Sequence, residues 1–162
     1  TGGSSMELRG TKITAPDVAT AWAHLNSPDT LPACIPGCEE LTGSPAEGFA
    51  ATVKQKVGPV KATFKGAVTL ENVLKNQSYT IVGEGKGGVA GFAKGGADVT
   101  LVAVPEGTEL TYDATAKVGG KLAQLGNRII GGFARKMADQ FFENFQNVVE
   151  DAPNAGTSAS SD

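Results

Sequence analysis

The alternation of apolar and polar residues changes its period twice along the chain. Residues 7–14 alternate weakly and predict a first strand. In the stretch PDVATAWAHLN, Pro16 is well placed for a first helical turn, and Val18, Trp22 and Leu25 fall on one helix face. A second short helical turn is predicted over 29–34, because Pro36 and Gly37 follow it.

From residue 39 to residue 118 the period is two, which predicts antiparallel strands. Segments rich in Gly, Pro and Asn divide this region into about six strands. The breaks are expected at 43–48, 58–59, 72–77, 87–91 and 105–107.

The last predicted element is one long helix over 121–150, because its apolar residues recur at steps of three and four. These residues are Leu122, Leu125, Ile129, Phe133, Met137, Phe141, Phe145 and Val148. A sheet must bury one face, and this helix is the largest apolar element that could cover it. The fold class predicted is therefore α+β: a curved antiparallel sheet of about six or seven strands wrapped around a long C-terminal helix, with two short helices after the first strand.

The 162 residues suit one domain. TGGSS at 1–5 precedes Met6 and is typical of a cloning remnant, so the domain is expected over 6–150. Residues 151–162 form a polar tail that cannot build a core. The net charge of −3 argues against a nucleic-acid partner. Cys34 and Cys38 have no further cysteines or histidines near them and are expected to be unlinked thiols, not a zinc site.

The stretch GEGKGGVAG at 83–91 matches the G-x-G-x-x-G fingerprint of dinucleotide-binding proteins. That fingerprint requires a helix directly after the glycines, whereas a β-branched run follows here. On a strand, Gly83, Gly85 and Gly87 would share one face with Tyr79 and Ile81, and the charged residues between them would face solvent. The glycines are therefore predicted to line the covered face of the sheet.

Hairpin pairing gathers small residues on this covered face. It brings Ala62 and Gly66 near the glycines of 83–87, and these near Gly95 and Ala97, which in turn lie near Ala114 and Ala116. A face reduced to Gly and Ala cannot fill the space beneath the helix, which predicts an internal apolar cavity. Alternatively, the glycines bend the sheet or form bulges, and both explanations can hold together.

The cavity is predicted to take a lipid or a ring-bearing isoprenoid, because its few polar groups include the Gln55 amide and the Tyr79 and Tyr112 hydroxyls. The predicted ligand-binding residues are Val53, Gln55, Val57, Phe64, Val68, Gly83, Gly85, Gly87, Phe92, Ala97, Leu101, Tyr112, Ala114, Leu122, Leu125, Ile129, Phe133 and Met137. His24 lies between apolar positions, and no carboxylate pair falls on the covered face, so we do not expect an enzyme.

The GGVAGF tip carries Val89 and Phe92 on a glycine-rich turn. Two interpretations stay open. The tip could be a gate or a lip that contacts a membrane or a partner, or it could be an ordinary hairpin tip folded onto the helix.

Four stretches together resemble the CoxG family of carbon monoxide dehydrogenase accessory proteins over about residues 6–149: ACIPGCEEL, VGPVKATFKGAVTL, GEGKGGVAGFAKGGADVTL and VGGKLAQLGNRIIGGFARKMADQFFENF. The resemblance implies the START-like, helix-grip fold. It also implies a non-catalytic accessory protein that recruits a molybdenum–copper, iron–sulfur and flavin dehydrogenase to the cytoplasmic membrane. Many members of the family carry a C-terminal membrane-binding extension, so the native chain is expected to continue past Asp162. The implied location is cytoplasmic, peripheral on the inner face of that membrane.

The cavity and the resemblance together suggest a carrier of a respiratory quinone such as menaquinone. Leu125, Ile129, Phe133, Phe64, Val57 and Tyr112 would grip the ring and the first isoprenoid units, with Gln55 or Tyr112 available to a quinone oxygen. Two alternatives remain: a pure membrane anchor for the dehydrogenase, and a polyketide-cyclase-like enzyme of the same superfamily.

Overall fold

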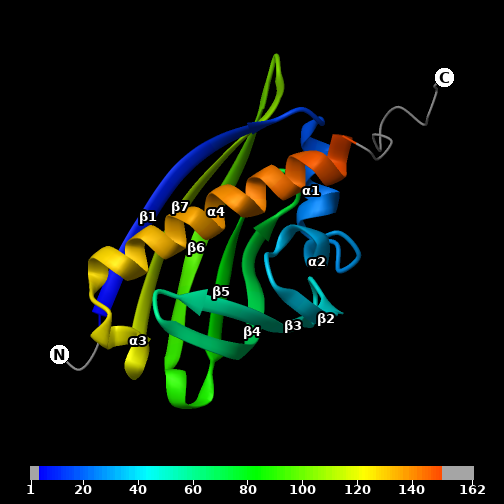
Figure 1. The fold of residues 1–162 in the computed structure, drawn as a ribbon. Helices are drawn as coiled ribbons and strands as arrows, with labels where there is room; N and C mark the ends of the chain where they lie inside the picture. The colour runs from blue at the N-terminus through cyan, green and yellow to red at the C-terminus, as the bar shows by residue number, and fades with distance from the viewer. Residues whose placement is uncertain (1–3, 151–162) are drawn as a thin grey trace.

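The computed structural model describes residues 4–150, in which a long helix crosses one face of a seven-stranded antiparallel sheet (Figure 1). The strand order is β1-β7-β6-β5-β4-β3-β2. The elements are β1 Ser4–Thr14, α1 Val18–Leu25, α2 Leu31–Cys34, β2 Cys38–Ser44, β3 Gly48–Val57, β4 Val60–Leu74, β5 Ser78–Lys86, the 3₁₀ turn η1 Gly88–Ala90, β6 Phe92–Val104, β7 Gly107–Gly119, α3 Lys121–Gln124 and α4 Asn127–Glu150. The predicted α+β class, the two short helices and all five strand breaks are confirmed.

The first strand begins earlier than predicted. Ser4 and Ser5 pair with Val118 and Lys117 near the C-terminal end of β7. Part of the segment that was expected outside the fold therefore belongs to β1. The predicted polar tail, 151–162, lies outside the described residues.

The short helices close one end of the sheet, beside the C-terminal half of α4 (Figure 1). Asp17 caps α1: its carboxylate accepts a hydrogen bond from the Thr20 N–H at 2.9 Å. Hydrogen bonding to the Thr20 side chain, and then to the Thr20 N–H, lowers the pKa of Asp17. His24 Nδ1 lies 3.0 Å from Thr30 Oγ1 and links α1 to the start of α2.

The prediction of a single helix over 121–150 was wrong in one respect, because the segment forms two helices, α3 and α4. Leu125 and Gly126 interrupt it, and Gly126 has a φ of +88°, a left-handed conformation that glycine adopts without penalty. The buried face of α4 begins one residue later than predicted, although Phe145 of the predicted stripe is buried. Ile130 is buried, whereas Ile129, predicted to face inward, is 43% exposed.

The C-terminal half of α4 is fastened to β1 and α2. Lys12 Nζ forms an ion pair with Asp139 Oδ1 at 2.8 Å, and the Thr14 hydroxyl donates to the side-chain oxygen of Gln146. Asn144 Nδ2 donates to the Cys34 carbonyl oxygen at 3.0 Å. The helix is therefore held across the sheet at the end where α1 and α2 lie.

Buried apolar side chains form two separate groups. The main core joins the sheet to α1, α2 and the second half of α4: Leu8, Ala21, Trp22, Leu25, Cys34, Tyr79, Val99, Leu101, Leu110, Tyr112, Phe145 and Val149. A smaller group, which we call the α3-end cluster, lies at the other end of α4: Val57, Val118, Leu122 and Ile130.

Candidate functional site

An apolar cavity of about 660 Å³ lies under α4, on the covered face of the sheet. Ligand pockets in proteins commonly enclose roughly 300–1,000 Å³. Strands β3 to β7 form its floor, and the α4 side chains Ala138, Phe141 and Phe142 form its roof. Leu31 and Ile35 of the α2 segment close one side. The predicted internal cavity is thus present.

The floor of the cavity is built from small residues that the register places side by side. Gly66 faces Gly85 across β4 and β5, and Gly83 faces Gly95 across β5 and β6. Gly95 in turn faces Ala116 on β7. This is the gathering of small residues that the pleat predicted.

The glycines of the floor serve two different purposes. A Cβ built on Gly85 meets nothing closer than the Lys65 carbonyl oxygen at 3.9 Å, and a Cβ on Gly66 nothing closer than the Glu84 carbonyl oxygen at 3.4 Å. By contrast, a Cβ on Gly95 would collide with the Thr115 carbonyl oxygen, and one on Gly96 would lie 2.6 Å from the Ile81 carbonyl oxygen. Gly66 and Gly85 therefore leave space in the cavity, whereas Gly95 and Gly96 permit close backbone approach. The strand register across residues 83–97 contains no bulge.

Two tyrosines, Tyr79 and Tyr112, line this apolar site. Tyr79 is 5% exposed, lines the cavity and packs edge-on against Trp22, with ring centroids 5.2 Å apart. Burial raises the pKa of Tyr79, and its hydroxyl has no hydrogen-bond partner among residues 4–150. Tyr112 stacks on Phe142 at 5.6 Å, and its ring lies over Gly10, where a Cβ would collide with it. Buried hydroxyls without partners are rare, so Tyr79 is a candidate to bind a ligand oxygen.

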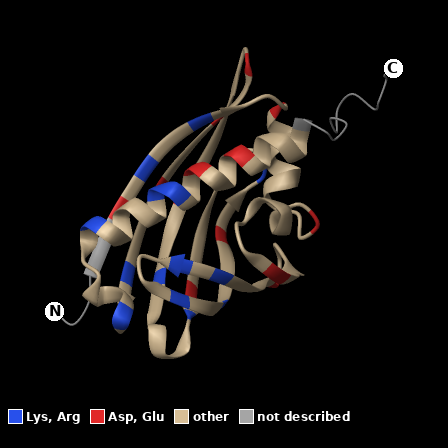
Figure 2. Cartoon of the chain, viewed as in Figure 1, with Lys and Arg blue, Asp and Glu red and all other residues tan. Residues whose placement is uncertain are grey.

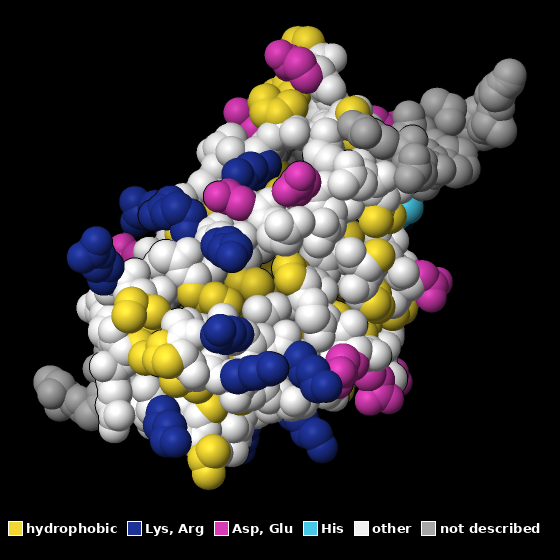
Figure 3. Space-filling view, in the orientation of Figure 1, with side chains coloured by type: hydrophobic (Ala, Val, Ile, Leu, Met, Phe, Trp, Pro, Cys, Tyr) yellow, Lys and Arg dark blue, Asp and Glu magenta, His cyan; other side chains and the backbone are white. Residues whose placement is uncertain are grey.

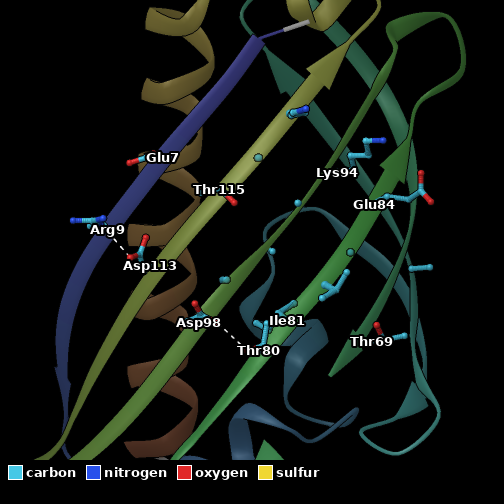
Figure 4. Close-up of a pocket in the computed structure, with 18 residues that line it drawn as sticks. Glu7, Arg9, Thr69, Thr80, Ile81, Glu84, Lys94, Asp98, Asp113 and Thr115 are labelled. Atoms are coloured by element: carbon cyan, nitrogen blue, oxygen red, sulfur yellow. Dashed lines mark hydrogen bonds and ion pairs between the residues drawn. The ribbon is translucent and has the colours of Figure 1, made fainter. Parts of the chain in front are cut away.

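A second, wider hollow of about 980 Å³ lies on the opposite, charged face of the sheet (Figure 4). Arg9 Nε and Asp113 Oδ2 form an ion pair at 3.2 Å in it, and Thr80 Oγ1 donates to Asp98 Oδ1 at 2.8 Å. Gly83, Gly95 and Gly96 border both spaces, so only backbone separates them there. The outer hollow is more polar than the inner cavity and carries the charged residues Glu7, Glu84 and Lys94, so the inner cavity is the better candidate for an apolar ligand.

The structure brings together eight of the predicted site residues as the cavity lining: Val53, Phe64, Val68, Gly83, Gly85, Ala97, Tyr112 and Ala114. Four others belong to the α3-end cluster or pack against it: Val57, Leu122, Leu125 and Phe133. Leu101 lies in the main core, and Gly87 lies beneath the ring of Phe64. Whether any of these residues binds a ligand stays a prediction.

Four predicted positions lie away from the cavity. Gln55 is not among the lining residues, and one of its amide N–H groups donates to the Pro36 carbonyl oxygen. Phe92 pairs with Lys86 on the outer face and covers Gly119, which is the face that alternation with Lys94 assigns to it. Ile129 is exposed, and Met137 is half-buried outside the lining.

Sequence reasoning missed part of the wall and the roof. Leu31 and Ile35 are four residues apart, a helical spacing that could have marked them as one apolar face. Phe141 stood in the predicted apolar stripe but was not assigned to the site, and Phe142 was not recognised at all. These two rings lie edge to face, with centroids 5.2 Å apart.

Other chemistry is sparse in the described part of the chain. Cys34 is buried and Cys38 half-buried, both as free thiols, and burial raises the pKa of Cys34 to about 11. Residues 4–150 contain no group of three His, Cys, Asp or Glu side chains that could hold a metal ion. Within the same residues, no helix has the length and apolarity needed to cross a bilayer.

Solved structures share the fold. The chain is 27% identical to a conserved protein from Geobacillus kaustophilus, with a TM-score of 0.83 over 90% of this chain and 95% of that one. A protein from Rhizobium leguminosarum matches with 13% identity and a TM-score of 0.70 over 93% and 97% of the two chains. Protein Ms6760 from Mycobacterium smegmatis matches with 14% identity and a TM-score of 0.65 over 91% and 93%. The last two show the fold alone.

No curated protein sequence matches the chain significantly. The family model of CoxG, the G subunit of carbon monoxide dehydrogenase, however, matches residues 10–150, which is most of the chain and includes every residue that lines the cavity except Leu8. The chain therefore belongs to the CoxG family of carbon monoxide dehydrogenase subunits.

Proposed function

We propose that this protein is a non-catalytic accessory subunit of a molybdenum-containing carbon monoxide dehydrogenase, and that it carries a respiratory quinone, most simply menaquinone, between the cytoplasmic membrane and that enzyme. The family supports the accessory role. The observation that carries the ligand is the apolar cavity with open space at Gly66 and Gly85. Unfilled core volume costs stability, so a protein that only anchored its partner would gain nothing from it.

The shape and chemistry of the cavity suit a flat ring with carbonyl oxygens. Phe141, Phe142 and Tyr112 offer aromatic faces and edges, which interact well with a planar π-system. The Tyr79 hydroxyl would donate a hydrogen bond to one carbonyl oxygen of the ring. The isoprenoid tail would follow the apolar side chains of Leu41, Ala51 and Val53 along β2 and β3.

Such a dehydrogenase must pass its electrons to a quinone that is insoluble in water, and a carrier protein would make this transfer possible. Oxidation of carbon monoxide with water to carbon dioxide releases two electrons and two protons. A quinone takes up both electrons and both protons and becomes the quinol, but it is insoluble in water. An apolar cavity shields the ring and the first isoprenoid units during transfer, because burial removes their surface from water.

Fluorescence of the single tryptophan gives a direct test. Trp22 contacts Tyr79, which lines the cavity, so a quinone bound there should quench it. We expect saturable quenching by a short-tailed menaquinone and a stoichiometric menaquinone in solvent extracts of protein purified from menaquinone-containing cells.

The control is a matched pair of leucine substitutions. Gly85→Leu places a side chain in the cavity, whereas Gly132→Leu places the same side chain on the exposed surface of α4, where a Cβ meets nothing within 4 Å. Quenching and bound quinone should disappear in Gly85→Leu and persist in Gly132→Leu. Equal behaviour of the two variants, or no quinone in either, would favour a pure anchor and refute the carrier.

A further inference from the structure

Lysines oppose one another across the sheet at the end where β5 turns into β6. Lys56 faces Lys61 across β3 and β4, and Lys65 faces Lys86 across β4 and β5. Lys94 faces Lys117 across β6 and β7. All six side chains are exposed, and none forms an ion pair with another described residue. Like charges placed directly opposite destabilise a sheet, so three such pairs call for an explanation outside the fold.

The charge is local, because the chain as a whole carries −3. Figure 2 shows Lys and Arg around the β3–β4 hairpin and the end of the molecule where α3 and the start of α4 lie. Lys121 of α3 and Arg128 of α4 add two exposed cations there, while Glu84, opposite Lys94 across β5 and β6, is an acid on the same face. This end therefore attracts anions although the protein is acidic.

Apolar side chains project from the same end. Val89, at the centre of the η1 turn, is 85% exposed, and Phe92 beside it is 39% exposed. The turn contacts both β4 and α3, so these side chains lie next to the lysines of β4 and β5. Figure 3 shows hydrophobic atoms bordered by dark blue lysines and arginines at this lower end. We call Val89, Phe92 and the three lysine pairs the basic tip.

We propose that the basic tip docks the folded domain on an anionic lipid bilayer. Lysines near an anionic leaflet gain from its surface potential, and apolar side chains at the centre of a basic surface enter the headgroup region. A carboxylate-rich protein surface would pair with the lysines, but it would offer no apolar environment in which to bury the protruding Val89 side chain. The inference deepens the proposed function, because a carrier must reach the bilayer, yet it concerns lipid binding alone and does not depend on a quinone.

Co-sedimentation with sucrose-loaded vesicles tests the proposal. The 162-residue chain is mixed either with phosphatidylcholine vesicles or with vesicles of two parts phosphatidylcholine to one part phosphatidylglycerol. We expect binding to the mixed vesicles only, weakening as salt rises from about 0.1 M to about 1 M because the screening length falls. Lys86→Gln should lower the vesicle partition coefficient about five-fold, the effect of one basic charge near such a surface.

Matched controls come from the opposite end of β4. Lys75→Gln removes an exposed lysine from the β4–β5 turn and should leave binding unchanged. Val89→Asp should abolish binding, whereas Val73→Asp, at a valine that is 50% exposed, should not. Trp22 quenching by a short-tailed menaquinone in vesicle-free solution should be equal in all four variants, which separates this inference from the carrier proposal.

Three results would overturn the inference: equal binding to both vesicle types, equal loss in Lys75→Gln and Lys86→Gln, or normal vesicle binding by Val89→Asp. If the basic-tip variants bind vesicles normally but no longer co-purify with the dehydrogenase, the surface belongs to the enzyme interface instead.

Discussion

Gly66 and Gly85 face each other across β4 and β5, and a Cβ built on either lies 4.0 Å from the Cα of the other. No side chain fills the space above this pair, although it lies on the covered face of a sheet. The arrangement distinguishes a glycine that leaves room from a glycine that the backbone requires, and the two kinds respond differently to substitution.

Gly85→Leu should leave the fold intact while filling the cavity. Its Cβ meets only ordinary van der Waals contacts, and the remaining leucine atoms enter empty apolar space. Filling a cavity of this kind commonly adds about 0.5–2 kcal/mol of stability. Urea unfolding should show an unchanged or higher midpoint together with lost quinone binding. A lower midpoint would mean that the space is not available to a side chain.

Gly95→Ala should destabilise the protein, in contrast. Its Cβ would meet the Thr115 carbonyl oxygen and lie 2.8 Å from the Cα of Ala116, so β6 and β7 would have to separate. Overpacking of this kind typically costs about 1–3 kcal/mol. The same exchange at Gly132, exposed on α4, should stabilise by up to about 1 kcal/mol through helix propensity. Unfolding curves of the two variants that move in the same direction would contradict this distinction.

Tyr79→Phe should weaken quinone binding without weakening the fold. The substitution removes a hydroxyl that has no hydrogen-bond partner in the described chain, so folding loses no hydrogen bond. Binding should lose one hydrogen bond of about 0.5–1.5 kcal/mol, roughly a two- to ten-fold rise in Kd. Titration by Trp22 quenching measures the Kd for the quinone. The control is an isoprenoid hydrocarbon that lacks carbonyl oxygens, whose Kd is measured by competition and should not change. Equal affinity of both proteins for the quinone would place the ring oxygen elsewhere.

The buried thiol of Cys34 should make stability depend on alkaline pH. Its pKa is raised from 9.0 to about 11 in the fold, so between these values the folded state binds more protons than the unfolded state. The free energy of unfolding should therefore fall as pH rises from about 9 to about 11. Urea unfolding across this range, with Cys34→Ala for comparison, isolates the contribution. The variant should show a flatter profile, and identical slopes would mean that the thiol does not titrate in this range.

Much of this arrangement followed from periodicity. Alternation placed Gly85 inward and Lys86 outward, and the Gly- and Pro-containing breaks set the hairpins that pair Gly66 with Gly85. The sequence pattern could not predict how the break at Gly126 changes which residues of the following helix face inward. The left-handed Gly126 interrupts the helix before Ile129, so Ile129, predicted to face inward, is 43% exposed. Phe92 instead follows the alternation of β6 and lies on the outer face with Lys94, so its assignment to the site did not follow from the pattern.

The hydrogen-bond partners of polar groups could not be predicted from the sequence pattern either. Gln55 alternates inward as predicted, but its amide is taken up by the Pro36 carbonyl oxygen, which only the folded loop brings close. The roof had a similar limit. A helical stripe identifies Phe141, whereas Phe142 depends on how far α4 is rotated over the sheet.

The main core and the α3-end cluster contact opposite ends of α4, and the cavity lies beneath the second half of that helix, beside the main core. The two clusters share no buried residue, so we expect the two ends to open as separate units. Amide exchange in α3 and the first turns of α4 should be faster than in the second half of α4, which α2 and β1 hold in place. A hydrophobic ligand in the cavity would add packing between the sheet and α4. We therefore expect ligand binding to slow amide exchange in α3 as well as around the cavity.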